Sequence, residues 1–287
     1  MPIDSAKTKE IRINERVRIG GGGPLFLIAG PCVIESEEHA VALARRAKEI
    51  CGRLGIPYIF KASFDKANRS SVKSYRGPGL EKGLAILKRV KEEAGVPVLS
   101  DVHETSQVGP AAEVLDVIQI PAFLCRQTDL IVEAARTKKP LNLKKGQFLS
   151  PQEMANALEK AESQGNDNVL LTERGTFFGY NNLVFDIRSI PVMKRWGRPV
   201  VLDATHIVQR PGGRGEASGG EAEFIPTMVR AGVAAGADGL FLEVHDHPEK
   251  ALSDGYNSLN INILYDILGA ARRIRAAVLE GETPAGS

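Results

Sequence analysis

The sequence predicts an α/β protein built as a single (β/α)8 (TIM) barrel, and two patterns carry that prediction. Short apolar runs recur eight times along the 287 residues, and an amphipathic stretch usually follows each run. Nearly every run also ends in polar or charged residues. Strands that are apolar on both faces and alternate with helices form parallel sheets, and a closed barrel carries its chemistry at the C-terminal ends of such strands. An open doubly wound sheet is the alternative, which the even spacing and the lack of a dinucleotide fingerprint disfavour.

The elements can be assigned by residue range. The predicted strands cover residues 25–29, 58–60, 96–99, 117–120, 141–143, 169–171, 200–202 and 239–242. Apolar positions three and four apart predict helices over 37–54 behind the N-cap Ser36, 80–94, 150–163 with Pro151 at the first position, and 260–278. Alternating apolar residues over 10–20 predict a small N-terminal hairpin, and the glycines at 20–23 a flexible break. We expect one domain over 1–287, without a linker.

Composition narrows the class of protein. The apolar share of 43% is enough for a large core, and the net charge of +2 gives no reason to expect nucleic acid or a membrane as a partner. The three cysteines do not form a disulfide framework and indicate a reducing compartment. The N-terminus lacks the pattern of a signal peptide, and no apolar run approaches transmembrane length. We therefore expect a soluble, cytoplasmic protein.

The segment KASFDKANRSS, residues 61–71, combines cations with hydroxyls directly after the second predicted strand. Three cations, three hydroxyls and one asparagine fall within these eleven residues. Ammonium, guanidinium and short hydroxyl donors at this density suit phosphate and carboxylate oxygens. The alternative is a solvated basic loop, which has no need of hydroxyls between its charges.

An anion site is predicted where this segment meets other strand ends. Its candidate members are Lys61, Lys66, Lys144, Arg174 and the segment Asn68, Arg69 and Ser70. Five cations with no matching run of acids would repel one another unless anionic ligands occupied the mouth of the barrel. More than one phosphate-bearing substrate is the simplest reason for that number. For any single member, an exposed or ion-paired side chain is the alternative.

A second group of candidates could bind a metal ion. Cys32 follows the first strand, His206 the seventh and Glu243 the eighth, while Asp254 lies in the final loop. Strands one, seven and eight become neighbours when a barrel closes, so these side chains could converge. A mixed set of sulfur, nitrogen and oxygen ligands suits zinc or ferrous iron better than magnesium, with manganese, cobalt or cadmium also possible. From spacing alone, a small buried Cys32 without a metal is the alternative.

Four further histidines need an assignment. His245 and His247 are rival metal ligands, and we place His245 outside the mouth. His103 is expected to be a hydrogen-bonded residue at a strand end, and His39 a residue on a helix surface.

A glycine-rich segment follows the seventh strand. Residues 209–220 contain five glycines and a proline, which predicts that the loop 207–220 is a mobile lid over the mouth. A disordered surface loop is the alternative and predicts the same mobility. Only the position of the loop favours the lid.

Six motifs together resemble one enzyme family. They are GPCVIES at 30–36, FKASFDKANRSS at 60–71, QIPAFLCRQTD at 119–129, KKGQF at 144–148, TERG at 172–175 and DATH at 203–206. This combination closely resembles the 3-deoxy-D-manno-octulosonate 8-phosphate synthases, and the match runs from about residue 24 to about residue 270. The resemblance implies a transferase that condenses phosphoenolpyruvate with D-arabinose 5-phosphate and water and releases phosphate. It also implies a homotetrameric barrel whose product enters lipopolysaccharide inner-core synthesis.

The resemblance assigns roles residue by residue. Lys61, Ser63, Lys66, Gln119, Lys144 and Arg174 correspond to the phosphoenolpyruvate pocket, which His206 borders. Asn68, Arg69 and Ser70 correspond to contacts with the pentose phosphate, with Arg126 entering from a neighbouring subunit. Lys61, Lys66, Asn68, His206 and Asp254 are the expected catalytic residues.

The family has a metal-dependent class and a metal-independent class. A cysteine in the first-strand motif marks the metal-dependent class and an asparagine the other, so Cys32 resembles a ligand, joined by His206, Glu243 and Asp254. One residue departs from the pattern of the metal-dependent class. Gly255 follows Asp254, and this Asp-Gly pair also occurs in metal-independent members. We give Cys32 more weight, since the type of ligand is the firmer requirement.

Three other functions fit the same barrel. The nearest is a 3-deoxy-D-arabino-heptulosonate 7-phosphate synthase, which a choice between erythrose 4-phosphate and arabinose 5-phosphate would distinguish. A divalent-metal aldolase would use a lysine Schiff base or a metal enolate. A non-catalytic sugar-phosphate binding protein would not need the metal ligands.

Overall fold

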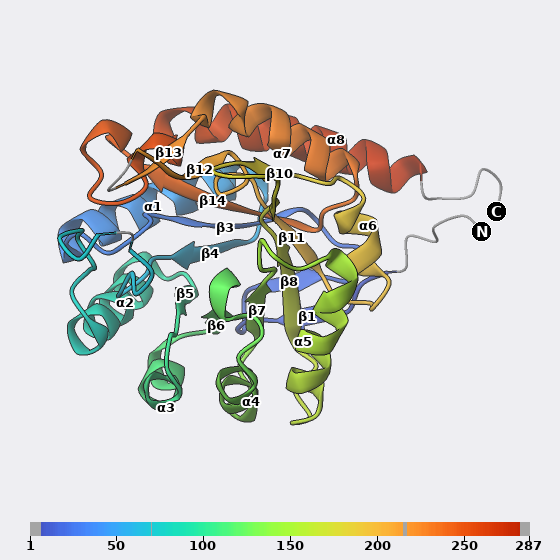
Figure 1. The fold of residues 1–287 in the computed structure, drawn as a ribbon. Helices are drawn as coiled ribbons and strands as arrows, with labels where there is room; N and C mark the ends of the chain where they lie inside the picture. The colour runs from blue at the N-terminus through green and yellow to red at the C-terminus, as the bar shows by residue number, and fades with distance from the viewer. Residues whose placement is uncertain (1–6, 70, 215–216, 282–287) are drawn as a thin grey trace.

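The computed structural model describes residues 7–69, 71–214 and 217–281. Its centre is a closed barrel of eight parallel strands (Figure 1). In chain order the strands are β3 (Phe26–Gly30), β4 (Tyr58–Lys61), β5 (Val98–Asp101), β6 (Val117–Ile120), β7 (Leu141–Lys144), β8 (Val169–Glu173), β11 (Val200–Asp203) and β14 (Gly239–His245). Each strand pairs with the next, and β14 pairs with both β11 and β3, which closes the ring.

Burial explains why the strands form a barrel. Every residue of these eight strands is buried, because one face meets the barrel interior and the other meets the surrounding helices. Continuous apolar strands of this kind require cover on both faces. The predicted (β/α)8 fold is therefore confirmed, and the open sheet is excluded.

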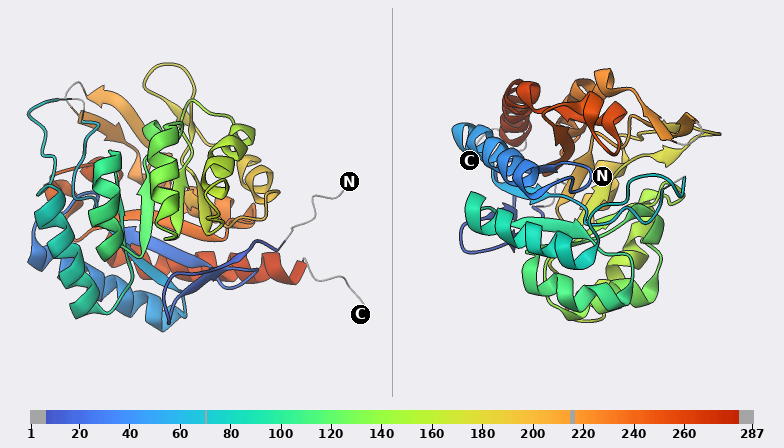
Figure 2. Two further views of the ribbon diagram at one scale, coloured as in Figure 1. Left: turned by 90° about the horizontal axis from the view of Figure 1, so that it is seen from below. Right: turned by 90° about the vertical axis from the view of Figure 1, so that its left-hand side faces the viewer.

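The helices surround the barrel, as Figure 2 shows. They are α1 (Glu37–Leu54), α2 (Leu80–Ala94), α3 (Thr105–Val114), α4 (Thr128–Arg136), α5 (Met154–Glu162), α6 (Ser189–Lys194), α7 (Ile225–Ala234) and α8 (Leu264–Gly281). Ser36 caps α1, because its side chain accepts a hydrogen bond from the His39 backbone N–H. The last helix begins four residues later than predicted, because a 3-10 turn over Ile261–Ile263 precedes it. No helix in the described part of the chain is both long and apolar enough to cross a membrane.

The N-terminal hairpin closes one end of the barrel. It consists of β1 (Glu10–Arg12) and β2 (Arg18–Gly20), as predicted. Ile11 and Ile19 are buried in one apolar cluster with inward-facing strand residues such as Phe26 and Phe241. The Lys9 backbone donates a hydrogen bond to the carbonyl of Gly197, which precedes β11. The hairpin therefore covers the N-terminal ends of the strands and leaves the C-terminal ends for the site.

Three small elements lie at the C-terminal end of the barrel. The glycine-rich segment forms a hairpin of β12 (Gln209–Arg214) and β13 (Ala217–Gly220), so it has more regular structure than the predicted loop. Its mobility as a lid over 207–220 stays a prediction. A second hairpin, β9 (Thr176–Phe177) with β10 (Leu183–Val184), was not predicted. The short β15 (Leu259–Asn260) extends the sheet beside β14.

Candidate active site

A cavity of about 1010 Å³ opens at the C-terminal ends of the barrel strands. Nine of the predicted site residues line it: Lys61, Lys66, Asn68, Arg69, Gln119, Lys144, Arg174, His206 and Asp254. They come from β4, β6, β7 and the segments after β4, β8, β11 and β14, so the barrel brings them together from distant parts of the chain. Pockets for one drug-sized ligand reach about 1000 Å³. The cavity therefore has room for two small substrates side by side.

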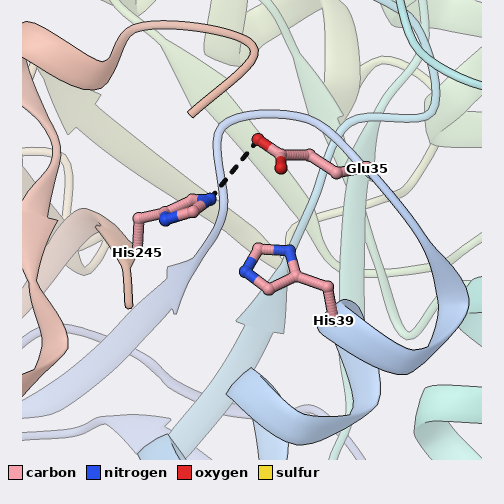
Figure 3. A group of neighbouring side chains, drawn as sticks. All are labelled: Glu35, His39 and His245. Atoms are coloured by element: carbon pink, nitrogen blue, oxygen red, sulfur yellow. Dashed lines mark ion pairs between the residues drawn. The ribbon is translucent and has the colours of Figure 1, made fainter. Parts of the chain in front are cut away.

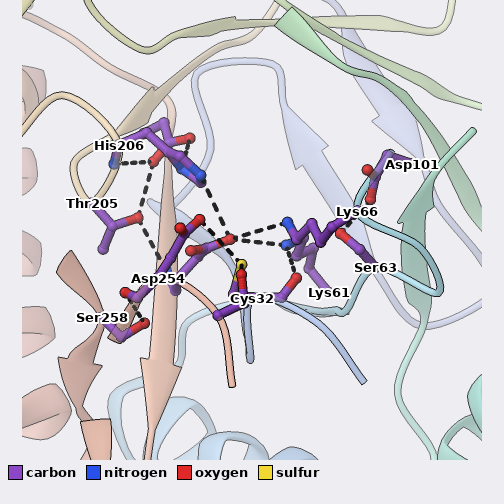
Figure 4. A network of polar contacts seen from close by, with 12 residues as sticks. Cys32, Lys61, Ser63, Lys66, Asp101, Thr205, His206, Asp254 and Ser258 are labelled. Carbon is purple, nitrogen blue, oxygen red and sulfur yellow. Dashed lines mark hydrogen bonds and ion pairs between the residues drawn. The ribbon is translucent and has the colours of Figure 1, made fainter. Parts of the chain in front are cut away.

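Two lysines share the carboxylate of Glu243, a residue of β14. The Lys61 ammonium donates to the Cys32 carbonyl at 2.8 Å and to Glu243 Oε1 at 3.0 Å, and Lys66 Nζ lies 3.8 Å from the same oxygen (Figure 4). Burial alone would raise the pKa of Glu243, but the nearby cations outweigh it and hold that pKa well below its ordinary value. Burial likewise opposes the charge on Lys66, but the surrounding carboxylates raise its pKa. Glu243 and Lys66 are therefore both charged at neutral pH.

On β11, the strand beside β14, the last residue Asp203 contacts both a lysine and a histidine. Lys144 donates to Asp203 Oδ2, and His206 Nδ1 lies 2.7 Å from that oxygen. Burial is the main cause of the lowered pKa of His206, so its imidazole is neutral at neutral pH. Burial also lowers the pKa of Lys144, which Asp203 only partly offsets. The proton on His206 is favoured at Nδ1, which leaves Nε2 facing Glu243 Oε1 at 3.6 Å.

Arg174 offers a donor that the described protein does not use. Its side chain is buried in the cavity wall, and its Nη2 donates to Gln209 Oε1 at 3.3 Å. Its Nη1 is buried and has no hydrogen-bond partner in the described residues. Leaving a buried charged donor unpaired is costly, so this atom is suited to an anionic oxygen of a ligand.

The cations are not as isolated as the sequence suggested. Carboxylates from four strand ends or loops stand among them: Asp101, Asp203, Glu243 and Asp254. The five cations are therefore matched by acids in the folded chain. The sequence has no run of acids, but the fold brings single acidic residues together from separate strands and loops. Repulsion among cations is consequently a weaker argument for anionic ligands than the unpaired Arg174 donor.

On the β5 side, a buried histidine and aspartate form a pair. His103 Nε2 lies 3.0 Å from Asp101 Oδ2, so His103 is hydrogen-bonded at the strand end as predicted. Burial alone would lower the pKa of His103, but the Asp101 carboxylate outweighs it and raises that pKa. Ser63, which was predicted to contact phosphoenolpyruvate, is fully buried and donates to Asp101 Oδ1. Gln119 accepts a hydrogen bond from Asn142 at 2.9 Å while it lines the cavity.

Three of the four predicted metal ligands form one compact group. Cys32, Glu243 and Asp254 each place a ligand atom within 4.8 Å of the others. The Cys32 sulfur lies 3.2 Å from Asp254 Oδ2 (Figure 4). His206 lies beside this group through its contact with Glu243 rather than inside it. The fold thus brings these predicted ligands together from the segment after β3, from β14 and from the loop after β14, as the closing of the barrel predicts.

The residues of this group fit a divalent cation. Glu243 Oε2 is buried and has no hydrogen-bond partner in the described part of the chain. Burial and the charges of Asp254 and Glu243 raise the pKa of the Cys32 thiol, which a bound cation would reverse by favouring the thiolate. Asp254 has φ 53°, a left-handed conformation that is uncommon for a side-chain-bearing residue and typical of functional sites.

The remaining predicted residues have separate positions. Arg69 donates to Ser253 Oγ at 2.7 Å and lies 3.5 Å from Asp254 Oδ1, so it faces the metal-ligand group. Arg126 is exposed and borders a small second cavity with Cys125 and Lys160. The prediction for Ser70 falls outside the described residues. Roles for these residues stay predictions.

Two residues were missed as site members although their motifs were noted. Asp101 and Asp203 each end a strand, and each contacts a histidine and a second polar group of the site. The signal was their place as the last residue of an apolar strand. Polar residues at that place in a barrel strand project toward the mouth.

Charged residues that converge at the C-terminal strand ends of a (β/α)8 barrel are the arrangement found in enzymes with this fold. The chain matches the model of the DAHP synthetase I family over residues 6–279. It is 60% identical over 270 residues to the 2-dehydro-3-deoxyphosphooctonate aldolase of Geotalea uraniireducens, covering 94% of this chain and 99% of that protein. The protein of the same name from Desulfosudis oleivorans is 59% identical over 274 residues, covering 95% of this chain and 98% of that protein.

The chain therefore belongs to the DAHP synthetase I family, within its group of 2-dehydro-3-deoxyphosphooctonate aldolases. That name denotes the same enzymes as 3-deoxy-D-manno-octulosonate 8-phosphate synthase. The resemblance stated from the six motifs is thus confirmed.

Proposed function

We propose that this protein condenses phosphoenolpyruvate with D-arabinose 5-phosphate and water to give 3-deoxy-D-manno-octulosonate 8-phosphate and phosphate. The relatives' name supports this reaction. The observation that carries it at the site is the buried, unpaired Nη1 of Arg174 in a cavity that Lys61, Lys66 and Lys144 also line. A carboxylate and two phosphates have the charge and the oxygen acceptors that these donors require.

The first task of the site is to hold two anions close together. Phosphoenolpyruvate would lie against Lys61, Lys144 and Arg174, and the pentose phosphate toward Asn68 and Arg69. Holding carbon 3 of phosphoenolpyruvate against the aldehyde carbon turns a reaction between repelling molecules into one within a complex. Such positioning can contribute roughly 7–11 kcal/mol.

The reaction balances without any further reactant. A carbon–carbon bond forms between carbon 3 and the aldehyde carbon, and water oxygen adds at carbon 2, where positive charge develops. One water proton reaches the former aldehyde oxygen. The other passes to the departing phosphate when the carbon 2–oxygen bond breaks and a ketone forms. Lys66 has a raised pKa, so we assign it the role of a charged donor to a developing anion rather than a base.

His206 and Asp254 both line the cavity in which the water would react. His206 is neutral and held by Asp203, so its Nε2 can accept or orient a proton there. A divalent cation held by Cys32, Glu243 and Asp254, with His206 beside them, would supply Lewis acidity to an oxygen there. Zinc or ferrous iron suits this donor set, with manganese, cobalt or cadmium as alternatives.

The proposed reaction can be tested by phosphate release. Purified protein is incubated with phosphoenolpyruvate and either D-arabinose 5-phosphate or erythrose 4-phosphate, before and after chelation. We expect phosphate with the pentose phosphate, little with erythrose 4-phosphate, and loss of activity on chelation. Faster release with erythrose 4-phosphate would instead support a heptulosonate-phosphate synthase. If neither sugar phosphate leads to phosphate release, the result would instead support a sugar-phosphate binding protein or an aldolase.

The metal ligands are tested by substitution of Cys32. The Cys32→Asn variant removes the thiolate and should lower the content of tightly bound metal by one ion per chain, measured by elemental analysis. It should also make the remaining phosphate release insensitive to chelation or abolish it. An unchanged metal content would overturn the assignment of Cys32 as a ligand.

Two further proposals concern the setting of the enzyme. The three cysteines are free and buried, which supports a reducing, cytoplasmic compartment. Phe123, Phe148, Phe177 and Phe178 are exposed. The segments that carry them adjoin one another, since Phe177 N–H donates to the Gln147 carbonyl and Gly146 lies against Cys125 and Phe148. An apolar surface of this kind supports an interface between subunits, consistent with a homotetramer in which Arg126 reaches a neighbouring site.

A further inference from the structure

A second group of metal-ligating side chains lies at the junction of β14, α1 and the loop after β3. Glu35, His39 and His245 each place a ligand atom within 4.8 Å of the others. Figure 3 shows the three side chains pointing toward one another. None of the three is among the described residues that line the large cavity. We propose that Glu35, His39 and His245 form a second binding site for a divalent cation, separate from the Cys32 group.

Two ring nitrogens of this group are buried and unpaired. His39 Nδ1 and His245 Nε2 have no hydrogen-bond partner in the described residues. The His245 side chain is only 7% exposed, and its Nε2 lies 3.4 Å from Glu35 Oε1, the ion pair that Figure 3 marks. A buried polar nitrogen without a partner is costly. Two such nitrogens beside a carboxylate form a donor set suited to a cation.

The outer nitrogens of the same rings share one carboxylate. His39 Nε2 and His245 Nδ1 each lie 3.0 Å from Asp246 Oδ1. Histidines that bind metals almost always use their second nitrogen in this way, because the carboxylate fixes the tautomer and the ring orientation. Asp246 therefore supports a state in which both rings carry their protons on the outer nitrogens. Lone pairs would then remain on His39 Nδ1 and His245 Nε2.

The backbone of His247 has an acceptor in either tautomeric state. Its N–H lies 2.9 Å from His245 Nδ1 and 3.1 Å from Asp246 Oδ1. Without a cation, His245 Nδ1 can accept this proton while Nε2 carries a proton toward Glu35. With a cation on His245 Nε2, the His247 N–H donates to Asp246 Oδ1. His245 Nδ1 then carries a proton and also donates to Asp246 Oδ1.

The chemistry of the donors indicates the type of cation. Two imidazoles and a carboxylate suit zinc, and three protein ligands leave a further position for water. The set has no thiolate, which distinguishes it from the Cys32 group.

The position of the site suggests what a bound ion does. Glu35 lies three residues after Cys32, and its Oε1 accepts the backbone N–H of Leu252 at 2.8 Å, two residues before Asp254. His245 lies two residues after Glu243. A cation that joins these segments would fix the loops that carry the first group of ligands. We therefore assign the second site a structural role.

The test begins with the Cys32→Asn protein, stripped of metal by a chelator and dialysed. Zinc is titrated into it by calorimetry, and the melting temperature is recorded with and without zinc. We expect one zinc ion per chain and a higher melting temperature, because an ion that binds the folded state stabilises it. No zinc binding to this folded variant would overturn the proposal.

Substitutions then locate the zinc. In the Cys32→Asn background, His39→Gln and His245→Gln should each abolish the binding event, and Asp246→Asn should weaken it about 10- to 100-fold. His247→Gln is the matched control, because it removes an exposed histidine from the same loop and should leave the affinity unchanged. Equal zinc affinity in the His39→Gln variant, or loss of zinc from the His247→Gln variant, would contradict the assignment.

A spectroscopic measurement keeps the test independent of how these variants fold. Cobalt replaces zinc in the stripped wild-type and Cys32→Asn proteins, and the absorption spectrum is recorded. The wild-type protein should show thiolate-to-cobalt charge transfer together with ligand-field bands. The Cys32→Asn protein should lose the charge transfer but keep ligand-field bands of a nitrogen and oxygen site. Loss of all cobalt bands in the Cys32→Asn protein would overturn the second site.

Discussion

Asp203 shows how one residue can organise several others. Its Oδ1 accepts the backbone N–H of His206 and the hydroxyl of Thr205, each at 3.0 Å. Its Oδ2 lies beside Lys144 and His206 Nδ1. Thr205 in turn accepts the backbone N–H of Glu243 at 3.1 Å. The carboxylate therefore sets the orientation of groups on β7, β11 and β14 at once.

Replacing Asp203 by asparagine should impair catalysis more than stability. The variant keeps the shape but loses the charge that orients His206 and holds Lys144. A charge-assisted hydrogen bond contributes about 1.5–3 kcal/mol, so we expect kcat/KM for phosphate release to fall roughly 10- to 100-fold. Asp116→Asn is the control, because Asp116 caps the opposite end of the barrel through the Val98 N–H. That variant should be less stable but retain kcat, and equal activity losses in both would contradict the role of Asp203.

The His103 and Asp101 pair makes a prediction about pH. The carboxylate holds the pKa of His103 above its ordinary value despite burial. Since the folded pKa exceeds the unfolded one, protonated His103 contributes stability that is present at acidic pH and is lost as the pH rises through the folded pKa. Asp101→Asn should lower the pKa of His103, measured from its ring proton signals by NMR. A pKa that does not move would show that another group sets it.

For individual residues, the sequence was a good guide to which ones line the cavity. It was a poor guide to which partners their side chains contact. Lys61, Lys144 and Arg174 were found because they follow apolar strands, and barrel topology places such residues at one end. The pairing of Ser63 with Asp101 depends on the register between β4 and β5, which no local pattern reveals. His39 was wrongly placed on a helix surface. It lies in the first turn of α1, where its ring packs 4.6 Å from that of His245.

Among the elements, the hairpin of β12 and β13 has the most direct connection to the site. Gln209 and Pro211 line the cavity, and Gln209 binds Arg174. Gly220, which pairs with Gln209 across the hairpin, packs against the 3-10 turn Gly255–Asn257 that follows Asp254. The element thus joins the anion donors to the metal-ligand group.

Gly220→Ala tests this connection. A Cβ at Gly220 would lie 2.7 Å from Asn257 Cβ and 2.8 Å from the Tyr256 carbonyl oxygen, so the hairpin or the turn must move. Displacement near Asp254 should lower kcat/KM by up to about 100-fold, since small misplacements in a site have large effects. Gly52→Ala is the control, because a Cβ there meets nothing within 4 Å and should leave the kinetics unchanged. Wild-type kinetics in the Gly220→Ala variant would show that the hairpin does not position the turn.

Long apolar and amphipathic elements were predictable, whereas short hairpins were not. The helix over 37–54 agrees with α1 because its periodicity and its N-cap Ser36 are both local signals. The two-residue strands β9 and β10 carry too few residues for alternation to appear. In β12 and β13 the glycines predicted a loop, because glycine disfavours strands and only pairing across the hairpin stabilises them.

For the whole molecule, the sequence predicted the closed barrel because eight units bury both faces of every strand. Closure itself follows from the pairing of β11 with β14 and of β14 with β3. The sequence pattern did not reveal the group of Glu35, His39 and His245, since His245 joins the other two only when β14 lies beside β3. The assembly of subunits was likewise implied only by resemblance. Arg126 is exposed and separate from the cavity of its own chain.

Mixing of variants tests whether Arg126 acts in a neighbouring subunit. Lys61→Ala should inactivate its own site, and Arg126→Ala should chiefly raise the KM for the pentose phosphate. In a mixed oligomer, a chain with Arg126→Ala keeps its own Lys61 and can receive Arg126 from a Lys61→Ala neighbour. After dissociation and reassembly together, phosphate release at low pentose phosphate should therefore exceed the sum of the two variants assayed separately.

A matched mixture controls for simple stabilisation by assembly. Lys61→Ala and Lys144→Ala affect residues that line the same chain's cavity, so every site in their mixed oligomer lacks one of the two lysines. Phosphate release by that mixture should not exceed the sum of the two variants assayed separately. If the mixture containing Arg126→Ala also shows no such gain, although sedimentation proves that mixed oligomers form, Arg126 does not complete a neighbouring site. A gain confined to the Arg126→Ala mixture requires a residue supplied across the interface, because no single chain in it has both Lys61 and Arg126.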